Sequence, residues 1–420
     1  MSAGLDRDLI RRGRERIAWV RSHMPVLASL EAELRPERPF AGLRIAVCIH
    51  LEAKTARLAL ALKELGAEVA IASSNPLSAK DDVVAALADE VATHARYGVS
   101  SAEYETYLER VLSIRPHLVL DDGADLCALL HGDGVELGPH VIGVCEETTT
   151  GLVRLRQFAR EGRLRFPAVA VNDARMKHLF DNRHGTGQSV WDAIMRSTNL
   201  LVSGKRVLVV GYGWCGRGIA QRARGLGAVV TVAEVNPVRA AEALLEGFSV
   251  APVRDALATA DFVISATGCT DAVTFEDLHA AQDGAILANA GHFDVEIDVR
   301  TLRARAEGRR VREYVEEFTL PTGKRVYLLA EGRLVNLVAG DGHPAEIMDL
   351  SFALQLLSLR WLAREGKGLV SGVYPVPPEV DDAVARRFLR SRGVRIDTLN
   401  PEQRAYLGLC RRGSTFPTSP

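Results

Sequence analysis

The chain has 420 residues, of which 47% are apolar and 25% are charged, and its formal net charge at pH 7 is −1. This composition is typical of a globular protein with at least two domains, each with its own core. The dispersed basic residues exclude the charge pattern of a nucleic-acid-binding surface.

The sequence predicts neither a targeting segment nor a membrane span. The N-terminus is charged from Asp6 onward, and no apolar run approaches about 18 residues. The six cysteines are scattered without a C-x-x-C pair, which argues against a zinc cluster or a disulfide framework and fits a reducing compartment. We therefore predict a cytoplasmic protein without a metal site.

Apolar runs and helical patterns alternate through residues 1–184. Residues 5–35 predict a helix, and further helices are expected at 55–65 and at about 150–160. Strands are expected at 43–49, 69–72, 118–120, 141–144 and 168–171. This alternation predicts a parallel sheet with right-handed crossovers, and therefore an α/β domain that we expect to bind the substrate.

Three polar residues follow strands of this predicted sheet. His50 follows the first strand, and Asp122 and Glu147 follow two later ones. Ligands of an open parallel sheet bind at the carboxyl ends of its strands. Any one of these residues could be an ordinary loop residue, but three at the same edge favour a binding site.

Lys177 and Asp181 are four residues apart, so they share one face if this segment is helical. They could form an ordinary surface ion pair. Alternatively, they could present a lysine and a carboxylate together to a substrate hydroxyl. A helix at about 189–202 then leads into the second half of the chain.

Residues 205–234 read as strand, G-x-G-x-x-G, helix, strand and acid. Gly211 allows a tight turn, Gly213 lets the backbone approach a pyrophosphate, and Gly216 lets the helix pack on the strand. Glu234 is placed to accept hydrogen bonds from the adenosine ribose and to repel a 2′-phosphate, which favours NAD. The glycines alone could form an ordinary turn, but the flanking strands and the acid favour a dinucleotide site.

The same alternation continues beyond Glu234. A strand at 262–265 leads to Thr267, and a strand at 286–288 leads to Gly291 and His292. We therefore predict a second doubly wound parallel-sheet domain, of the Rossmann type, over residues 185–345.

The last part of the chain is expected to return to the first domain. Residues 311–318 and 324–330 predict a hairpin, and a helix is expected at 345–364. Residues 346–378 are interpreted as the return segment and residues 379–420 as a loose C-terminal tail. Two α/β domains joined by two helical crossings predict a hinged cleft whose closure excludes water.

Several motifs resemble those of the S-adenosylhomocysteine hydrolase (adenosylhomocysteinase) family, over roughly residues 40 to 410. The combination is specific to that family, and the variants point to its archaeal-type branch. The motifs are Asp121-Asp-Gly, Glu146-Glu-Thr-Thr-Thr-Gly151, Lys177 with Phe180-Asp-Asn182, Gly211-Tyr-Gly213, Gly291-His-Phe-Asp-Val-Glu-Ile-Asp298, Glu331-Gly-Arg-Leu-Val-Asn336 and His343-Pro344.

The resemblance implies a redox-neutral hydrolysis of S-adenosyl-L-homocysteine to adenosine and homocysteine. Tightly held NAD⁺ oxidises the ribose 3′-hydroxyl, which acidifies the 4′ C–H. A base removes that proton, homocysteine leaves from C5′, water adds, and the ketone is reduced again.

The resemblance also implies a role for each matching residue. Lys177 and Asp181 would bind the oxidised hydroxyl, with Lys177 as its base, for which burial is expected to lower the lysine pKa. Glu147 would accept from a sugar hydroxyl. The 4′ proton, the leaving group and the water would be handled by His50, Asp122 and His292. NAD contacts would come from Thr148, Thr149, Thr150, Asn182, Gly211, Gly213, Gly216, Glu234, Thr267, Gly291 and Asn336, and the homocysteine and purine rim from His343 and Met348.

Some positions depart from the family pattern. Glu52 and Lys54 replace the residues that usually hold adenine; Glu52 could accept from an exocyclic amine and Lys54 could donate to a keto oxygen, as in hypoxanthine. Thr186 replaces a cysteine, and Asp341 replaces an apolar residue. The lysine and tyrosine that usually reach a neighbouring subunit are absent from the C-terminus.

Three functions are therefore weighed. The first is S-adenosylhomocysteine hydrolysis in a homo-oligomer, a dimer or a tetramer. The second is a related reaction on another nucleoside, either S-inosylhomocysteine hydrolysis or a dehydratase that stops at the exocyclic alkene, as in nucleoside antibiotic biosynthesis. The third is an inactive binding protein of the same fold, which is disfavoured because every redox and acid–base position holds a competent residue.

Overall fold

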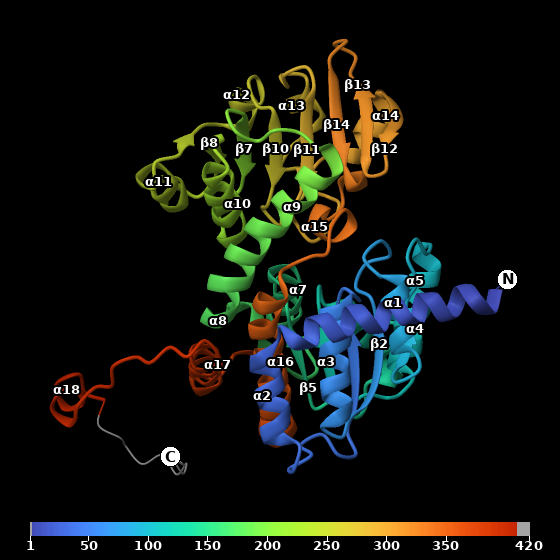
Figure 1. Cartoon of the computed structure of the whole chain (residues 1–420), viewed down its shortest axis with the longest axis vertical. Coiled ribbons are helices and arrows are strands. Elements are labelled where there is room, and N and C mark those ends of the chain that lie inside the picture. The colour runs from blue at the N-terminus through green and yellow to red at the C-terminus, as the bar shows by residue number, and fades with distance from the viewer. Residues whose placement is uncertain (1, 410–420) are drawn as a thin grey trace.

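The computed structural model describes residues 2–409 of the chain, with side chains from Arg7 onward. The chain forms two sheets, one in each half of the elongated molecule (Figure 1). Helices cover both faces of each sheet, so each half has a core on either side of its sheet. Two α/β domains were predicted, and the fold confirms this class.

The first sheet has seven strands in the order β15-β6-β5-β4-β1-β2-β3, and all neighbouring pairs are parallel. Because the strand order reverses between β1 and β4, the carboxyl ends of these two strands flank the expected ligand crevice. The strands are β1 (Arg44–Cys48), β2 (Glu68–Ala72), β3 (Ala92–His94), β4 (Leu118–Asp121), β5 (Gly143–Glu146), β6 (Pro167–Ala170) and β15 (Gly372–Pro375).

Two groups of helices pack on this sheet. One face carries α1 (Ser2–Ser22), α2 (Pro25–Leu34), α3 (Ala53–Glu64), α4 (Asp81–Leu87), α16 (Ala345–Glu365) and α17 (Pro378–Ser391). The other carries α5 (Ser101–Leu112), α6 (Asp125–Leu130) and α7 (Thr149–Arg160). None of the helices within residues 2–409 is long and apolar enough to cross a membrane.

The second sheet has eight strands in the order β12-β13-β14-β11-β10-β7-β8-β9. Apart from the antiparallel β12-β13-β14 edge, it has the Rossmann order, with its reversal between β7 and β10. The strands are β7 (Arg206–Val210), β8 (Val229–Ala233), β9 (Ser249–Val250), β10 (Phe262–Ser265), β11 (Ala285–Asn289), β12 (Glu307–Arg312), β13 (Val315–Thr319) and β14 (Arg325–Leu329).

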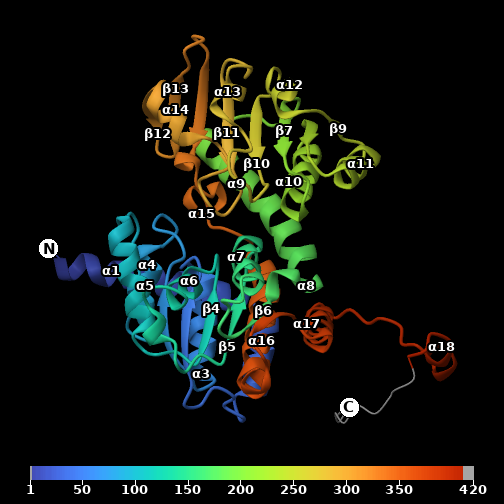
Figure 2. The ribbon, with the colours of Figure 1, turned by 180° about the vertical axis from the view of Figure 1, so that it is seen from behind.

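Helices also flank the second sheet on both faces. The helices are α10 (Trp214–Gly225), α11 (Pro237–Leu245), α12 (Val253–Leu257), α13 (Phe275–Leu278), α14 (Val299–Arg305) and α15 (Val335–Val338). The chain enters this domain through α8 (Arg175–Lys177), a π-helical segment (His178–Gly185) and α9 (Thr186–Thr198), and it leaves through α15 and α16. Seen from behind, both crossings run between the two sheets (Figure 2).

Three sequence predictions were wrong in detail. The helix expected at 5–35 is two helices, because Pro25 starts α2 and Asp349 caps its first N–H groups. The strand expected at 311–318 is two strands, since the chain reverses between β12 and β13.

The tail expected over 379–420 begins with α17 instead, whose Val380 and Val384 are buried on the first domain. Beyond it, an arm that carries α18 (Pro401–Tyr406) extends away from the body (Figure 1). Residues 410–420 lie outside the described residues.

Candidate active site

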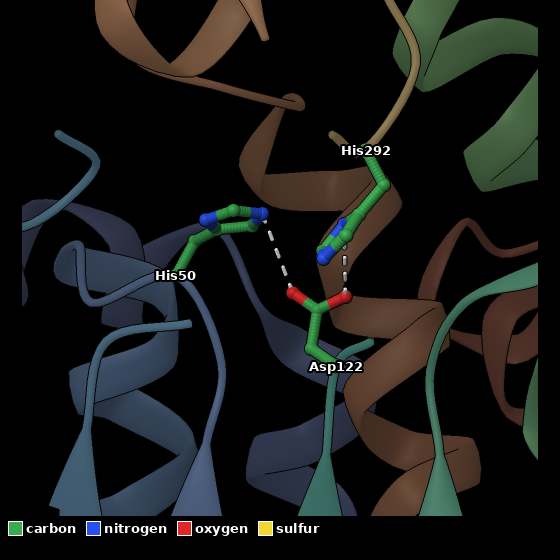
Figure 3. A group of neighbouring side chains, drawn as sticks. All are labelled: His50, Asp122 and His292. Carbon is green, nitrogen blue, oxygen red and sulfur yellow. Dashed lines mark ion pairs between the residues drawn. The ribbon is translucent and has the colours of Figure 1, made fainter. Parts of the chain in front are cut away.

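His50, Asp122 and His292 meet where the carboxyl edges of the two sheets face each other (Figure 3). His50 follows β1 and Asp122 follows β4, so both lie at the reversal of the first sheet, whereas His292 follows β11 of the second. Nε2 of His50 lies 3.5 Å from Oδ2 of Asp122, and Nδ1 of His292 lies 3.8 Å from Oδ1. The sequence placed these residues at strand ends, and the fold brings them together across two domains.

The approach of His292 depends on a glycine beside Asp122. Gly123 has a φ of +106°, and a Cβ at this position would lie 2.5 Å from Nε2 of His292. A side chain here would therefore be strained and would also collide with the imidazole. Gly123 thus permits contact between a loop of the first domain and a loop of the second.

His50 is buried, and burial lowers its pKa to about 4 even though the Asp122 carboxylate opposes that shift. Its imidazole is therefore neutral at pH 7. Nδ1 lies 2.8 Å from the Ser78 hydroxyl, a contact that fixes the ring orientation. The neutral, oriented imidazole is in the form that can accept a proton, and burial makes it a weaker base than a free histidine.

A second buried group surrounds the Lys177 ammonium. Its Nζ lies 3.4 Å from Oε1 of Glu147, 3.4 Å from Oδ1 of Asp181 and 3.0 Å from Oδ1 of Asn182. Lys177 ends α8, and Asp181 and Asn182 lie in the following π-helical segment. Such segments are often found at functional sites, and this one joins the two domains. Lys177 and Asp181, which the sequence spacing paired, are therefore part of a buried cluster and not of a surface ion pair.

The expectation that burial lowers the pKa of Lys177 was wrong. Burial does act in that direction, but the carboxylates of Asp181 and Glu147 outweigh it and raise the pKa of Lys177 above its usual range. Burial raises the pKa of Glu147 to about 7, against the opposing effect of the Lys177 charge. The cluster thus holds a protonated lysine beside a carboxyl group that gains a proton near neutrality.

Helix α16 supplies polar contacts that the sequence interpretation missed. Ser351 donates to Oδ2 of Asp181 at 2.6 Å, and Gln355 donates to Oε2 of Glu147. The sequence pattern predicts only the apolar face of this helix. Ser351, Gln355 and Ser358 form a buried polar stripe at helical spacing, which was the available signal.

Glu146 is a further buried residue that the sequence interpretation did not assign. Its Oε1 accepts from the backbone N–H groups of Gly123 and Thr148 and from the Thr148 hydroxyl. Burial raises its pKa well above the usual range, and the paired Asp121 carboxyl on β4 adds to this. Glu146 therefore ties the loop that carries Asp122 to the loop that begins α7.

The glycine-rich loop has the shape required for a dinucleotide. Gly211 has a φ of +97°, and a Cβ on Gly216 would lie 1.9 Å from the Gly211 carbonyl oxygen. A Cβ on Gly213 would meet only Nη1 of Arg239, at 3.9 Å, so the loop is open where a pyrophosphate would lie. Glu234 accepts from the Tyr212 N–H at 2.7 Å and remains half-buried beside this loop. These residues fit NAD.

Other predicted cofactor residues lie around the same edge. The backbone and hydroxyl of Thr267 both donate to Glu296, whose Oε1 would lie 1.7 Å from a Cβ on Gly291. Asn336 is buried and donates to Ser189 at 3.0 Å. The second domain therefore uses Glu296 to fix its loops, as the first uses Glu146.

Asn172 links the predicted cofactor residues of the first domain. Its Nδ2 donates to the Thr149 hydroxyl at 3.0 Å, and its Oδ1 accepts from Asn182 at 3.1 Å. Thr148 caps α7, while the neighbouring Thr150 is half-buried in its first turn. Sequence reasoning gave no role to Asn172.

The predicted rim residues fall into two groups. Lys54 and Glu52 are buried and paired, with Nζ 2.7 Å from Oε2, and Nζ also donates to the Asp341 carbonyl at 2.8 Å. His343 lies instead beside the lysine cluster, with Nδ1 2.8 Å from Oδ1 of Asp181. Met348 is half-buried and packs against the core of the first domain.

Comparison with known proteins agrees with this architecture. The family model described as S-adenosyl-L-homocysteine hydrolase matches residues 5–138, and the one described as S-adenosyl-L-homocysteine hydrolase, NAD binding domain, matches residues 182–342. The fold and these matches define a two-domain enzyme with NAD as its cofactor. The chain belongs to the S-adenosyl-L-homocysteine hydrolase family.

Its similar relatives cover nearly the whole chain. An S-inosyl-L-homocysteine hydrolase from Methanopyrus kandleri is 52% identical over 412 residues, which are 97% of each chain. An adenosylhomocysteinase from Thermotoga maritima is 53% identical over 397 residues, 94% of this chain and 98% of the relative. Another from Pyrococcus abyssi is 52% identical over 411 residues, 97% of each chain.

Proposed function

We propose that the protein catalyses the reversible hydrolysis of S-adenosyl-L-homocysteine to adenosine and homocysteine, through transient oxidation of the ribose 3′-hydroxyl. Bound NAD supplies the hydride acceptor that this oxidation needs. The observation that carries the proposal is the buried lysine cluster: Lys177 lies between Asp181 and Glu147, at the crossing between the domains. A lysine flanked by two carboxyl groups is suited to bind a sugar hydroxyl and to remove its proton.

We assign to Lys177 the role of the base that removes the proton of the 3′-hydroxyl. Its ammonium must first lose a proton, and the two carboxylates oppose that loss. Glu147 can make this loss easier. Because its pKa is raised, Glu147 can hold a proton near neutrality, and a neutral Glu147 stabilises the Lys177 ammonium less than a carboxylate does. Asp181 keeps its charge, since Lys177 and His343 outweigh the effect of burial and lower its pKa.

We assign the chemistry at C4′ and C5′ to His50, Asp122 and His292. The neutral His50 can accept the 4′ proton, and Asp122 joins it to His292 from the other domain. The departing thiolate and the attacking water both need a proton carrier at C5′, which the same three side chains provide. We propose that residues 1–184 with 346–378 close on residues 185–345 and keep bulk water away.

A second candidate is S-inosylhomocysteine hydrolysis, which the Glu52–Lys54 pair favours. Adenine presents a donor at N6 and an acceptor at N1, whereas hypoxanthine presents an acceptor at O6 and a donor at N1. A carboxylate beside an ammonium matches either edge. The relatives carry both names. We propose that the pair admits both bases.

The test is thiol release from each substrate by the NAD-loaded protein. The proposal predicts release of one thiol per nucleoside from S-adenosylhomocysteine. The ratio of the kcat/KM values for S-adenosylhomocysteine and S-inosylhomocysteine measures which base the enzyme prefers. No thiol from either substrate would refute hydrolysis. Loss of water from a nucleoside without thiol release would indicate the dehydratase instead.

We further propose a homo-oligomer, a dimer or a tetramer, working in the cytoplasm. The arm beyond α17 supports association, because Ile396, Tyr406 and Leu409 are exposed on it. The five described cysteines are free thiols, as expected in a reducing compartment. Light scattering on the full chain, compared with a chain ending at residue 392, tests the assembly.

A further inference from the structure

The Asp122 carboxylate depends on its own loop for its position between the two histidines of Figure 3. Its separations of 3.5 Å from His50 and 3.8 Å from His292 are longer than ordinary hydrogen bonds. Oδ2 accepts from Ser74 at 3.2 Å, and within the described part of the chain Oδ1 has no hydrogen-bond partner. Because side-chain contacts hold this carboxylate so weakly, the backbone that carries it has to be fixed.

That backbone has an unusual shape. Gly123 and Ala124 follow Asp122, and their φ angles are +106° and +61°. Ala124 is buried and immediately precedes α6. A left-handed conformation is uncommon for alanine, and it persists where the surrounding structure determines the backbone. The loop therefore needs contacts from neighbouring elements to keep this shape.

Side chains from two neighbouring elements bind both backbone polar groups of Gly123. The N–H donates to Oε1 of Glu146 at 3.0 Å, and the carbonyl accepts from Nη1 of Arg154 at 2.7 Å. Glu146 is buried at the end of β5, and Arg154 is half-buried on α7. The peptide groups on either side of Gly123 are thus fixed relative to the first domain.

Arg154 is itself held by two further helices. The same Nη1 donates to Oδ1 of Asp125 at 2.6 Å, and Oδ2 of Asp125 accepts from the Tyr104 hydroxyl at 2.8 Å. Tyr104 lies on α5, Asp125 begins α6 and Arg154 lies on α7, so three helices on one face of the first sheet meet behind Gly123. Charge-assisted hydrogen bonds of this kind are the stronger ones in proteins.

We propose that Arg154 is a positioning residue for the chemistry at C4′ and C5′. It fixes Gly123 together with Glu146, and the fixed loop keeps the Asp122 carboxylate between the two histidines. The inference rests on the proposed function, which gives those three side chains that chemistry. Oxidation at C3′ is assigned instead to the cluster around Lys177, on the crossing between the domains. Loss of Arg154 should therefore slow one part of the reaction and spare the other.

Rapid mixing of the full-length, NAD-loaded Arg154→Met protein with S-adenosylhomocysteine tests this separation. We expect reduced nicotinamide to form within about twofold of the wild-type rate, whereas thiol release slows by about 10- to 100-fold, as for a displaced catalytic group. Arg154→Lys should recover part of the rate, because a single nitrogen makes both contacts of Arg154. The matched control is Arg160→Met, which removes an exposed arginine from the same helix and should change neither step.

Hydrogen–deuterium exchange at the Gly123 amide gives a measurement that does not depend on activity. In Arg154→Met this amide should exchange at least about tenfold faster, and in Arg160→Met it should exchange as in wild type. Tyr104→Phe is a milder variant that removes only the donor to Asp125, and it should shift exchange and thiol release in the same direction by less. Thermal unfolding confirms that each variant is folded.

Three results would overturn the proposal: equal slowing of both steps in Arg154→Met, no change in either step, or unchanged exchange at Gly123. A wild-type protein that forms no reduced nicotinamide with either substrate would instead refute the proposed function, and with it the step assigned to Arg154. Faster exchange at Gly123 in Arg154→Met would in that case still establish that Arg154 holds the loop.

Discussion

His343 contacts Asp181, with Nδ1 2.8 Å from Oδ1, and this joins the two crossings between the domains. Asp181 lies in the π-helical segment that enters the second domain, and His343 lies two residues before the first residue of α16, the helix that leaves it. The same carboxylate also faces Lys177. A hinge movement that separates the crossings therefore changes the surroundings of the lysine assigned to the sugar hydroxyl.

His343→Ala should slow the reaction without weakening cofactor binding. Asp181 would lose a hydrogen-bond partner, and removing one donor to a buried carboxylate costs about 1–3 kcal/mol. We expect kcat to fall about 10- to 100-fold while the Kd for NAD stays unchanged, as measured by thiol release and NAD titration. His343→Gln, which keeps a donor, should recover part of the rate. Equal rates for wild type and His343→Ala would contradict this role.

Gly123→Ala should prevent His292 of the second domain from reaching Asp122 of the first. The added Cβ would be strained in the existing backbone, whose φ is +106°, and it would also collide with His292. Gly98→Ala is the matched control, because Gly98 has a φ of +77° but nothing within 4 Å of an added Cβ. Both variants should lose about 1–2 kcal/mol of stability, yet only Gly123→Ala should lose activity, by at least 100-fold. Similar activities in the two variants would argue against the contact.

The raised pKa of Glu147 should be visible in the pH dependence of the free energy of unfolding. Its pKa is raised from 4.5 to about 7 in the folded chain. The contribution of this group is therefore fully present below its unfolded pKa and is lost as pH rises through about 7. Relative to wild type, Glu147→Gln should become more stable between about pH 4.5 and 7, by at most about 3 kcal/mol, and level off above. Denaturant unfolding at each pH measures this, and a pH-independent difference would contradict it.

Lys54→Met should change the choice of base. It removes the donor to O6 of hypoxanthine, whereas adenine keeps the bond from its N6 to Glu52. We expect the kcat/KM ratio to shift about tenfold toward the adenosyl substrate. Lys80→Met is the matched control. Lys80 is half-buried and, like Lys54, donates to backbone carbonyls, in its case those of Leu337 and Gly340. A ratio that stays constant in Lys54→Met would remove Lys54 from base recognition.

The sequence predicted well what depends on local pattern. The alternation of strands and helices gave both sheets, and strand ends located His50, Asp122 and His292. Contacts between distant segments left no such pattern. The Gly123–His292 approach depends on how two domains meet, and the pKa of Lys177 depends on carboxylates that only the folded chain brings beside it. Those are properties of tertiary packing.

The central claim is that a sugar hydroxyl is oxidised beside Lys177 during the reaction. Rapid mixing of the NAD-loaded protein with S-adenosylhomocysteine, followed by the absorbance of reduced nicotinamide, tests it most directly. We predict a transient that forms before thiol appears and decays as turnover ends, and that falls in rate by about 10²–10⁴-fold in Lys177→Gln. Thiol release that proceeds at full rate without any such transient, in wild type or in the variant, would contradict the account.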